Sequence, residues 1–237
     1  MRILIGTSGY GYKEWKGPFY PPGMKHSGML SFYAGRFSSV EINNTFYRIP
    51  SEQVILNWVE SVPVGFTFAV KGPGKITHRK RLKNIEDDLA YFLKTIDVFG
   101  PKLGVILWQL HPSMKLDMDR FPRILTQLPS NLPCAFQLQH ESWRNEEVFA
   151  MLRERNYAVC NVDTDDSQLY KLTSTADFGY LRLRKTVYTD DDLKRIHMII
   201  LEQSWTHAFI FFKHEKSADG VTYALKMSEL VGTDAEH

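Results

Sequence analysis

The sequence has few cysteines and no long apolar run, and both absences exclude classes of protein. Cys134 and Cys160 are the only cysteines among 237 residues, and each lies within an apolar stretch. Their spacing matches neither a metal site nor a disulfide framework, so we expect two reduced core residues in a cytoplasmic protein. No apolar run approaches the roughly 18 residues that a membrane span needs, so we expect no membrane partner. Because Met1-Arg2 leads straight into a short apolar stretch, we also expect no secretory signal.

The chain has no large excess of either positive or negative charge. One segment of it, however, carries positive charges alone. The chain carries 29 Lys and Arg against 27 Asp and Glu, a formal net charge of +2. From residue 71 to residue 85, however, every charged side chain is basic. We interpret this basic segment, residues 71–85, either as a solvated loop or as a binding site for phosphate groups. Arginine would give such groups bidentate contacts, and lysine would act as a point charge.

Short apolar strands alternate with helical patterns along the whole chain. One strand carries Val40 and Ile42, and seven more are predicted at residues 2–7, 66–71, 103–110, 133–139, 157–162, 178–184 and 208–212. Asn84 is predicted to cap the helix that follows the basic segment, and Thr189 with Asp192 predicts a capping box. Neither a glycine-rich dinucleotide fingerprint nor a phosphate-binding P-loop follows any strand. We therefore predict an α/β fold, a single (β/α)8 barrel that spans residues 1–237.

Several motifs together resemble one family of proteins. They are Ile5-Gly6-Thr7-Ser8-Gly9, the stretches 15–21, 40–50 and 66–71, Thr77-His78, and His140-Glu141-Ser142-Trp143. This combination resembles the YecE-like family, and the resemblance implies a TIM-type barrel in a cytoplasmic family without an established biochemical role. The chain departs from the family pattern where relatives usually carry Glu and Arg, at Gln137 and Gln139, and where they often carry His, at Arg184. Lys213-His214 stands near the last strand, where the family pattern has an Asn pair.

Polar residues follow the predicted strands, and in barrels of this class the active site lies at that end. These strand-exit residues are Thr7, Ser8, Glu41, Asn43, Lys71, Gln109, Gln137, Gln139, His140, Asp163, Arg182, Lys213 and His214. We predict Glu41 or Asp163 as the base, His140 as the acid or proton shuttle, and Lys71 with Arg182 as the groups that neutralise phosphate charge. An alternative interpretation is that Glu41 and Lys71 form a buried ion pair that closes the barrel mouth.

A second set of residues is predicted to bind substrate, because cations interleaved with aromatic rings hold nucleotides or single-stranded nucleic acid. The set is Thr7, Ser8, Tyr12, Trp15, Asn43, Tyr47, His78, Arg81, Gln109, Gln137, Gln139, Trp143 and Arg182. Glu41, His140 and Asp163 could together bind a divalent metal. The sequence has no His-x-x-x-His pair, however, so we predict no metal ligands and leave the cofactor open.

Three functions remain open from the residues. The first is a hydrolase-type enzyme that acts on a phosphate-bearing substrate, either a nucleotide, a nucleic acid or a sugar phosphate. The second is a non-catalytic module that binds nucleic acid or nucleotides through the basic segment. The third is a barrel that has lost its activity, as the neutral side chains of Gln137 and Gln139 would suggest. The oligomeric state is also open.

Overall fold

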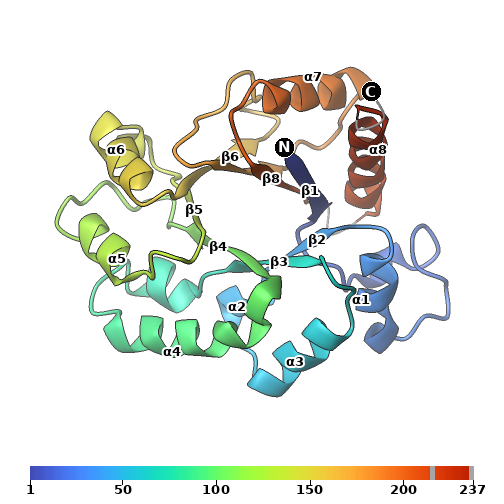
Figure 1. The fold of residues 1–237 in the computed structure, drawn as a ribbon, viewed down its shortest axis with the longest axis horizontal. Coiled ribbons are helices and arrows are strands. Elements are labelled where there is room, and N and C mark those ends of the chain that lie inside the picture. The colour runs from blue at the N-terminus through green and yellow to red at the C-terminus, as the bar shows by residue number, and fades with distance from the viewer. Residues whose placement is uncertain (214–216, 235–237) are drawn as a thin grey trace.

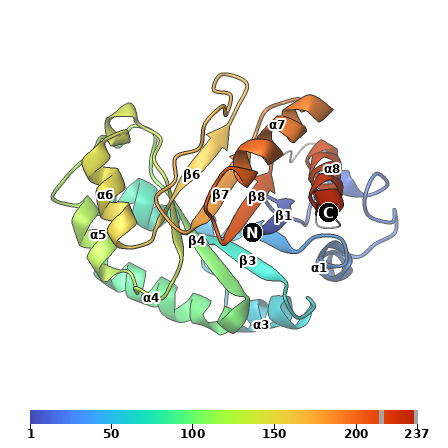
Figure 2. The same cartoon turned by 45° about the horizontal axis from the view of Figure 1, so that its top comes forward.

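Eight parallel strands alternate with helices around a ring. The computed structural model describes residues 1–213 and 217–234, and within them the strands follow one another in the order β1-β8-β7-β6-β5-β4-β3-β2. The strands are β1 (Arg2–Thr7), β2 (Ser39–Ile42), β3 (Thr67–Lys71), β4 (Leu103–Gln109), β5 (Cys134–Gln137), β6 (Ala158–Asp163), β7 (Phe178–Leu183) and β8 (His207–Phe212). The helices are α1 (His26–Ala34), α2 (Asn44–Tyr47), α3 (Glu52–Glu60), α4 (Glu86–Ile96), α5 (Phe121–Gln127), α6 (Glu146–Glu154), α7 (Asp190–Leu201) and α8 (Asp219–Asp234). Most of these helices surround the ring of strands (Figures 1 and 2).

The ring closes where β1 meets β2. Ser8 and Glu41 form a parallel bridge there, and the backbone N–H of Gly9 donates to the Glu41 carbonyl oxygen at 2.8 Å. A side chain on Gly6 would place its Cβ 2.0 Å from the carbonyl oxygen of Ser39, so only glycine lets the two strands approach this closely. The closed ring confirms the predicted (β/α)8 barrel of the TIM type.

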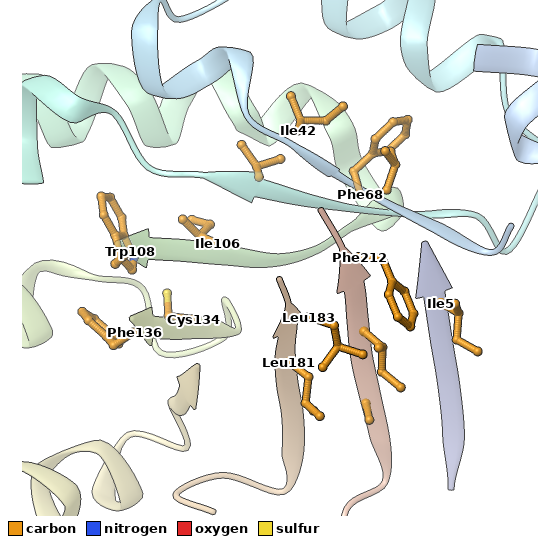
Figure 3. Packing of buried hydrophobic residues seen from close by; sticks show 14 of the residues in the cluster. Ile5, Ile42, Phe68, Ile106, Trp108, Cys134, Phe136, Leu181, Leu183 and Phe212 are labelled. Carbon is orange, nitrogen blue, oxygen red and sulfur yellow. The ribbon is translucent and has the colours of Figure 1, made fainter. Parts of the chain in front are cut away.

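Alternate residues of each strand face either the inside of the barrel or the helices, because side chains along a strand alternate in direction. The inner set is a buried cluster of Leu4, Ala69, Val105, Leu107, Ala135, Ala158, Cys160, Phe178, Tyr180, Phe209 and Phe211. The outer set belongs to a larger cluster that includes Ile5, Phe68 and Trp108, and Figure 3 shows part of it. Cys134 lies in the outer cluster, and both cysteines are buried and free of disulfides, as predicted.

One local prediction is wrong and one is confirmed. Helix α4 has Ile85 rather than Asn84 at its N-cap, without a capping side chain. Asn84 has a φ of 49°, a left-handed conformation that asparagine tolerates, so it ends the preceding turn instead of starting the helix. Directly after Asn43 the chain forms the short helix α2. The capping box of Thr189 and Asp192 is present at the start of α7. Among the helices of the described residues, none has the length and apolar character to cross a membrane.

Candidate functional site

A buried carboxylate and a buried guanidinium hold the mouth of the barrel together. Glu41 on β2 and Arg182 on β7 are 0% and 1% exposed, and their side chains form an ion pair of 2.7 Å. Glu41 Oε1 also accepts hydrogen bonds from Ser8 Oγ at 2.7 Å and from Asn43 Nδ2 at 3.1 Å. Glu41 Oε2 accepts a hydrogen bond from the Tyr180 hydroxyl at 2.6 Å. Four donors therefore surround this carboxylate.

These donors fix the charge of Glu41. Burial alone would raise the pKa of the carboxyl, but Arg182 and the hydroxyls of Tyr180 and Ser8 outweigh it and hold the pKa at about 2. Glu41 is therefore ionised at neutral pH, and both of its carboxylate oxygens accept hydrogen bonds from neighbouring side chains. This geometry suits a counter-ion of Arg182 better than the base that the sequence predicted.

The predicted ion pair between Glu41 and Lys71 is wrong. Within residues 1–213 and 217–234, the ion-pair partner of Glu41 is Arg182, and the Lys71 Nζ lies 4.2 Å from the centroid of the Phe46 ring. The long Arg182 side chain reaches from β7 to β2, and its planar guanidinium can serve several acceptors at once. Its other arm, Nη1, donates to Gln137 Oε1 at 2.7 Å and to Gln109 Oε1 at 3.2 Å.

Lys71 lies in a cationic environment at the end of β3. Lys71 lies two residues after Ala69 in the same strand, so its side chain points to the same face, which is the inside of the barrel. Burial, followed by the positive charges of Arg182 and Arg184, lowers the pKa of Lys71 to about 8, although Glu41 opposes the change. Burial and Arg182 also lower the pKa of Arg184, and within residues 1–213 and 217–234 the buried Arg184 Nε has no hydrogen-bond partner.

His78 lies beside Phe46 and Lys71, and His111 lies beside His78. The ring of His78 contacts the edge of Phe46 at a centroid distance of 4.8 Å and that of His111 at 5.0 Å. The His78 Nδ1 lies 2.9 Å from Thr77 Oγ1. Burial, followed by the neighbouring His111 and Lys71, lowers the pKa of His78 to about 4. The predicted site residue His78 is thus a neutral imidazole at pH 7.

A cavity opens beside the mouth, between β5 and β6. These strands pair only through Ala135–Ala158 and Phe136–Val159, so they separate toward their carboxyl ends. The space there has a volume of about 560 Å³, within the range of small-molecule sites. Among the described residues that line it are the cations Arg144, Lys171 and Arg184, together with Gln137 and Gln139, and none is an Asp or Glu. Gln137 and Arg184 belong both to this side cavity and to the surroundings of Arg182.

Three predicted strand-exit residues lie away from this arrangement. Asp163 is buried on the outer parity of β6, and its Oδ1 accepts the backbone N–H of Leu169 at 2.6 Å. The Thr7 hydroxyl donates to the carbonyl oxygen of Gly9 at 2.7 Å. The His140 Nδ1 accepts the backbone N–H of Ser142 at 3.1 Å and caps the short 3-10 helix Glu141–Trp143. Each of these groups stabilises local structure.

The predicted aromatic residues lie in different environments. Trp15 and Trp143 are fully buried, and their indole N–H groups donate to the carbonyl oxygens of Ser217 and Met114. The Tyr12 hydroxyl donates to the Ser8 carbonyl oxygen at 2.7 Å. Tyr47 is 82% exposed. The four rings therefore do not form a common stacking surface.

The basic segment is partly neutralised by its own fold. Lys75 and Lys80 both contact the carboxylate of Asp88, at 2.6 Å and 2.8 Å. Arg81 is exposed and has a φ of 48°. The exposed Gln139 donates through Nε2 to the Leu110 carbonyl oxygen at 2.5 Å.

The three residues that could together have bound a divalent metal, Glu41, His140 and Asp163, do not come together. Within the described part of the chain, no group of three or more His, Cys, Asp or Glu side chains could hold a metal ion, so Glu41, His140 and Asp163 do not form such a site. Of the predicted pair Lys213-His214, His214 lies outside the described residues. Lys213 is partly buried, and its backbone N–H donates to the Leu183 carbonyl oxygen at 3.0 Å.

Sequence reasoning missed several residues of the site. Tyr180 and Arg184 share the inner parity of Arg182 on β7, and that alternation is the signal that would have found them. Phe46 and His111 gave no signal, because their positions depend on α2 and on the loop after β4. Arg144 and Lys171 reach the side cavity from loops that no strand pattern places.

Comparison with known proteins identifies the family. The family described as "Protein of unknown function DUF72" matches residues 4–237. The chain belongs to this family. A DUF72 family protein from Thermotoga maritima MSB8 has a similar structure, with a TM-score of 0.86 and 25% identity, covering 98% of this chain and all of that one. Another from Enterococcus faecalis V583 has a TM-score of 0.80 at 18% identity, covering 97% and 95% of the two chains, and shows the fold alone.

Two curated relatives of this DUF72 chain also match, which confirms the predicted YecE-like resemblance. The UPF0759 protein YecE of Escherichia coli K12 is 29% identical over 112 residues, which are 47% of this chain and 41% of YecE. The UPF0759 protein YunF of Bacillus subtilis 168 is 26% identical over 149 residues, 60% of this chain and 52% of YunF. The alignments thus span about half the length of these curated relatives. None of these names states an activity.

Proposed function

We propose that this DUF72 chain is an enzyme that acts on a phosphate-bearing small molecule at the carboxyl ends of its barrel strands. The observation that carries the proposal is an imbalance of charge in a largely buried place. Arg182 and Arg184 both lower the pKa of Lys71, Arg182 also lowers that of Arg184, and the ionised carboxylate among these cations is Glu41. An anionic ligand would supply the missing negative charge.

The side cavity supports the same ligand chemistry. Its cationic lining of Arg144, Lys171 and Arg184 would attract a phosphate group, and the amides of Gln137 and Gln139 would accept and donate hydrogen bonds to hydroxyl groups. Arg184 lies at the junction of this cavity with Lys71. We therefore place the phosphate at Arg184 and the reacting part of the molecule toward Lys71. A cytoplasmic location is part of this proposal, supported by the two free, buried cysteines.

The two other functions have less support. A nucleic-acid module would need stacked rings beside free cations, but Trp15 and Trp143 are buried and Asp88 occupies Lys75 and Lys80. If the barrel had lost its activity through Gln137, the side-chain amide of Gln137 would be expected to have no role in the site. Instead, the Gln137 oxygen accepts a hydrogen bond from the central guanidinium of Arg182.

Calorimetric titration with a phosphate monoester tests the proposal. Replacement of Arg184 with methionine should weaken binding about tenfold or more, because a hydrogen bond to a charged group contributes about 1.5 to 3 kcal/mol. Arg36→Met is the matched control, since Arg36 lies after α1 at the opposite end of the barrel, over the Phe32 ring. Equal affinity of the wild-type protein and Arg184→Met for the ester, or no binding by either, would refute the phosphate site.

A further inference from the structure

Among the described residues, Lys71 has no ion-pair partner. Glu41 raises its pKa through its charge, but the oxygens of Glu41 accept hydrogen bonds from Arg182, Tyr180, Ser8 and Asn43 instead. The face of the Phe46 ring lies beneath the Nζ at 4.2 Å. Other lysines of the chain have such partners, since Lys75 pairs with Asp88 and Lys102 donates to two carbonyl oxygens.

The position of Lys71 is that of a nucleophile. It lies at the carboxyl end of β3, on the inner face of the barrel, where substrates of such barrels bind. A lysine becomes nucleophilic when it is desolvated or placed next to another cation, since both conditions favour the neutral amine. Lys71 meets both conditions, with Arg182 and Arg184 nearby, and its pKa of about 8 leaves an appreciable neutral fraction at physiological pH.

We propose that Lys71 forms an imine with the carbonyl group of its substrate, an aldehyde or ketone that also bears a phosphate. This inference rests on the proposed function and names the substrate class. The lone pair of Nζ attacks the carbonyl carbon, and the carbonyl oxygen takes a proton to give a carbinolamine. Loss of water then forms the C=N bond, and hydrolysis of that bond regenerates the free lysine. No oxidant or reductant is consumed.

Borohydride trapping with pyridoxal 5′-phosphate tests the imine, since this probe carries both an aldehyde and a phosphate. Hydride adds to the imine carbon and leaves a stable secondary amine. The full-length protein is labelled first and then digested, and peptide mass mapping locates the modified lysine. We expect Lys71 to carry most of the label in the wild-type protein and Lys102 to carry none. Labelling should rise with pH around a midpoint near 8, where the amine loses its proton. Label distributed over the surface lysines, with none at Lys71, would overturn the imine.

Pyridoxal, which lacks the phosphate, separates the two proposals. At equal concentration, pyridoxal 5′-phosphate should label Lys71 about tenfold faster than pyridoxal, and Arg184→Met should remove that advantage. Equal labelling of Lys71 by both aldehydes would support the imine and refute the phosphate site. If inorganic phosphate competes with the phosphate monoester in calorimetry while Lys71 stays unlabelled, the phosphate site is supported and the imine is refuted. Lys71→Arg, which keeps the charge, should fold normally and lose the label.

Discussion

At the scale of single residues, the stability of the barrel mouth depends on Arg182 rather than on Lys71. Arg182→Met removes the ion pair from Glu41 and leaves a carboxylate that is 0% exposed. We expect it to lower the free energy of unfolding by about 3 to 5 kcal/mol, the usual cost of an unpaired buried charge. Lys71→Met should change it by less than about 1 kcal/mol, because Lys71 forms no ion pair with Glu41 and its removal relieves repulsion from Arg182. Urea unfolding of both variants measures the difference.

The matched control for this prediction is the double variant Glu41→Gln with Arg182→Met. Glutamine keeps the shape of Glu41 without its charge, so the double variant should recover part of the stability that Arg182→Met loses. Arg182→Met within about 1 kcal/mol of the wild-type protein would contradict the pairing, because it would mean that Glu41 finds water or another partner.

The residues of the site were predictable only in part from the sequence. The strand exits were placed correctly, and Glu41, Asn43, Gln109, Gln137 and Arg182 lie together at the barrel mouth. Their role in binding or catalysis stays a prediction. On most strands the sequence did not show which exits face the inside, because strands covered on both faces are apolar in both directions. Asp163 was therefore included although its side chain lies on the outer face of β6. On β7 the alternation does give a signal, yet Arg184 was left out although it shares the inner face with Arg182. The partner of a long side chain is also hard to predict from the sequence, since Arg182 on β7 reaches Glu41 on β2.

At the scale of elements, the seam between β1 and β2 depends on a glycine. Gly6→Ala places a methyl group 2.0 Å from the Ser39 carbonyl oxygen and 2.7 Å from the Tyr33 hydroxyl. Because a backbone atom is the nearest neighbour, the strands must move apart, and we expect a loss of about 3 kcal/mol or more, the upper end of overpacking costs. Thermal and urea unfolding measure it.

Gly28→Ala is the control for the seam. Gly28 lies in helix α1, and a Cβ there meets nothing within 4 Å. Alanine in a helix loses less backbone entropy than glycine, so this variant should be unchanged or more stable by up to about 1 kcal/mol. Equal stability of Gly6→Ala and Gly28→Ala would show that the two strands can separate at no cost.

The elements themselves were largely predictable, because the eight apolar strands and the helices between them have clear periodicities. The errors lie where short-range geometry decides. Asn84 looked like a helix cap, but its left-handed backbone belongs to the turn that follows the π-helix Lys75–Arg79. Helix α2, at Asn44–Tyr47, is too short for any periodicity to reveal. Its Phe46 nevertheless forms one wall of the site beside Lys71.

At the scale of the whole molecule, the distribution of charge matters more than its sum. A formal net charge of +2 gives no general attraction to polyanions. The cations of the barrel mouth are largely buried. In the basic segment, two lysines form ion pairs with Asp88. Within the basic segment, exposed cations without an ion pair among the described residues remain at Arg79, Arg81 and Lys83. This segment therefore offers a nucleic acid few contacts, whereas the barrel mouth offers a small anion several.

Titration with a fluorescent single-stranded oligonucleotide at several salt concentrations tests this distribution. Three free cations would release about two counterions, since each neutralised phosphate of a single strand contributes about 0.7 to the slope of log affinity against log salt. We expect weak binding with a slope of no more than about 2 and no effect of Arg184→Met, whose site a polymer does not enter. A triple substitution of Arg79, Arg81 and Lys83 by alanine should abolish what binding there is. Tight binding with a much steeper slope would instead favour a nucleic-acid module, because so many released counterions would require a phosphate-binding surface far wider than these three side chains.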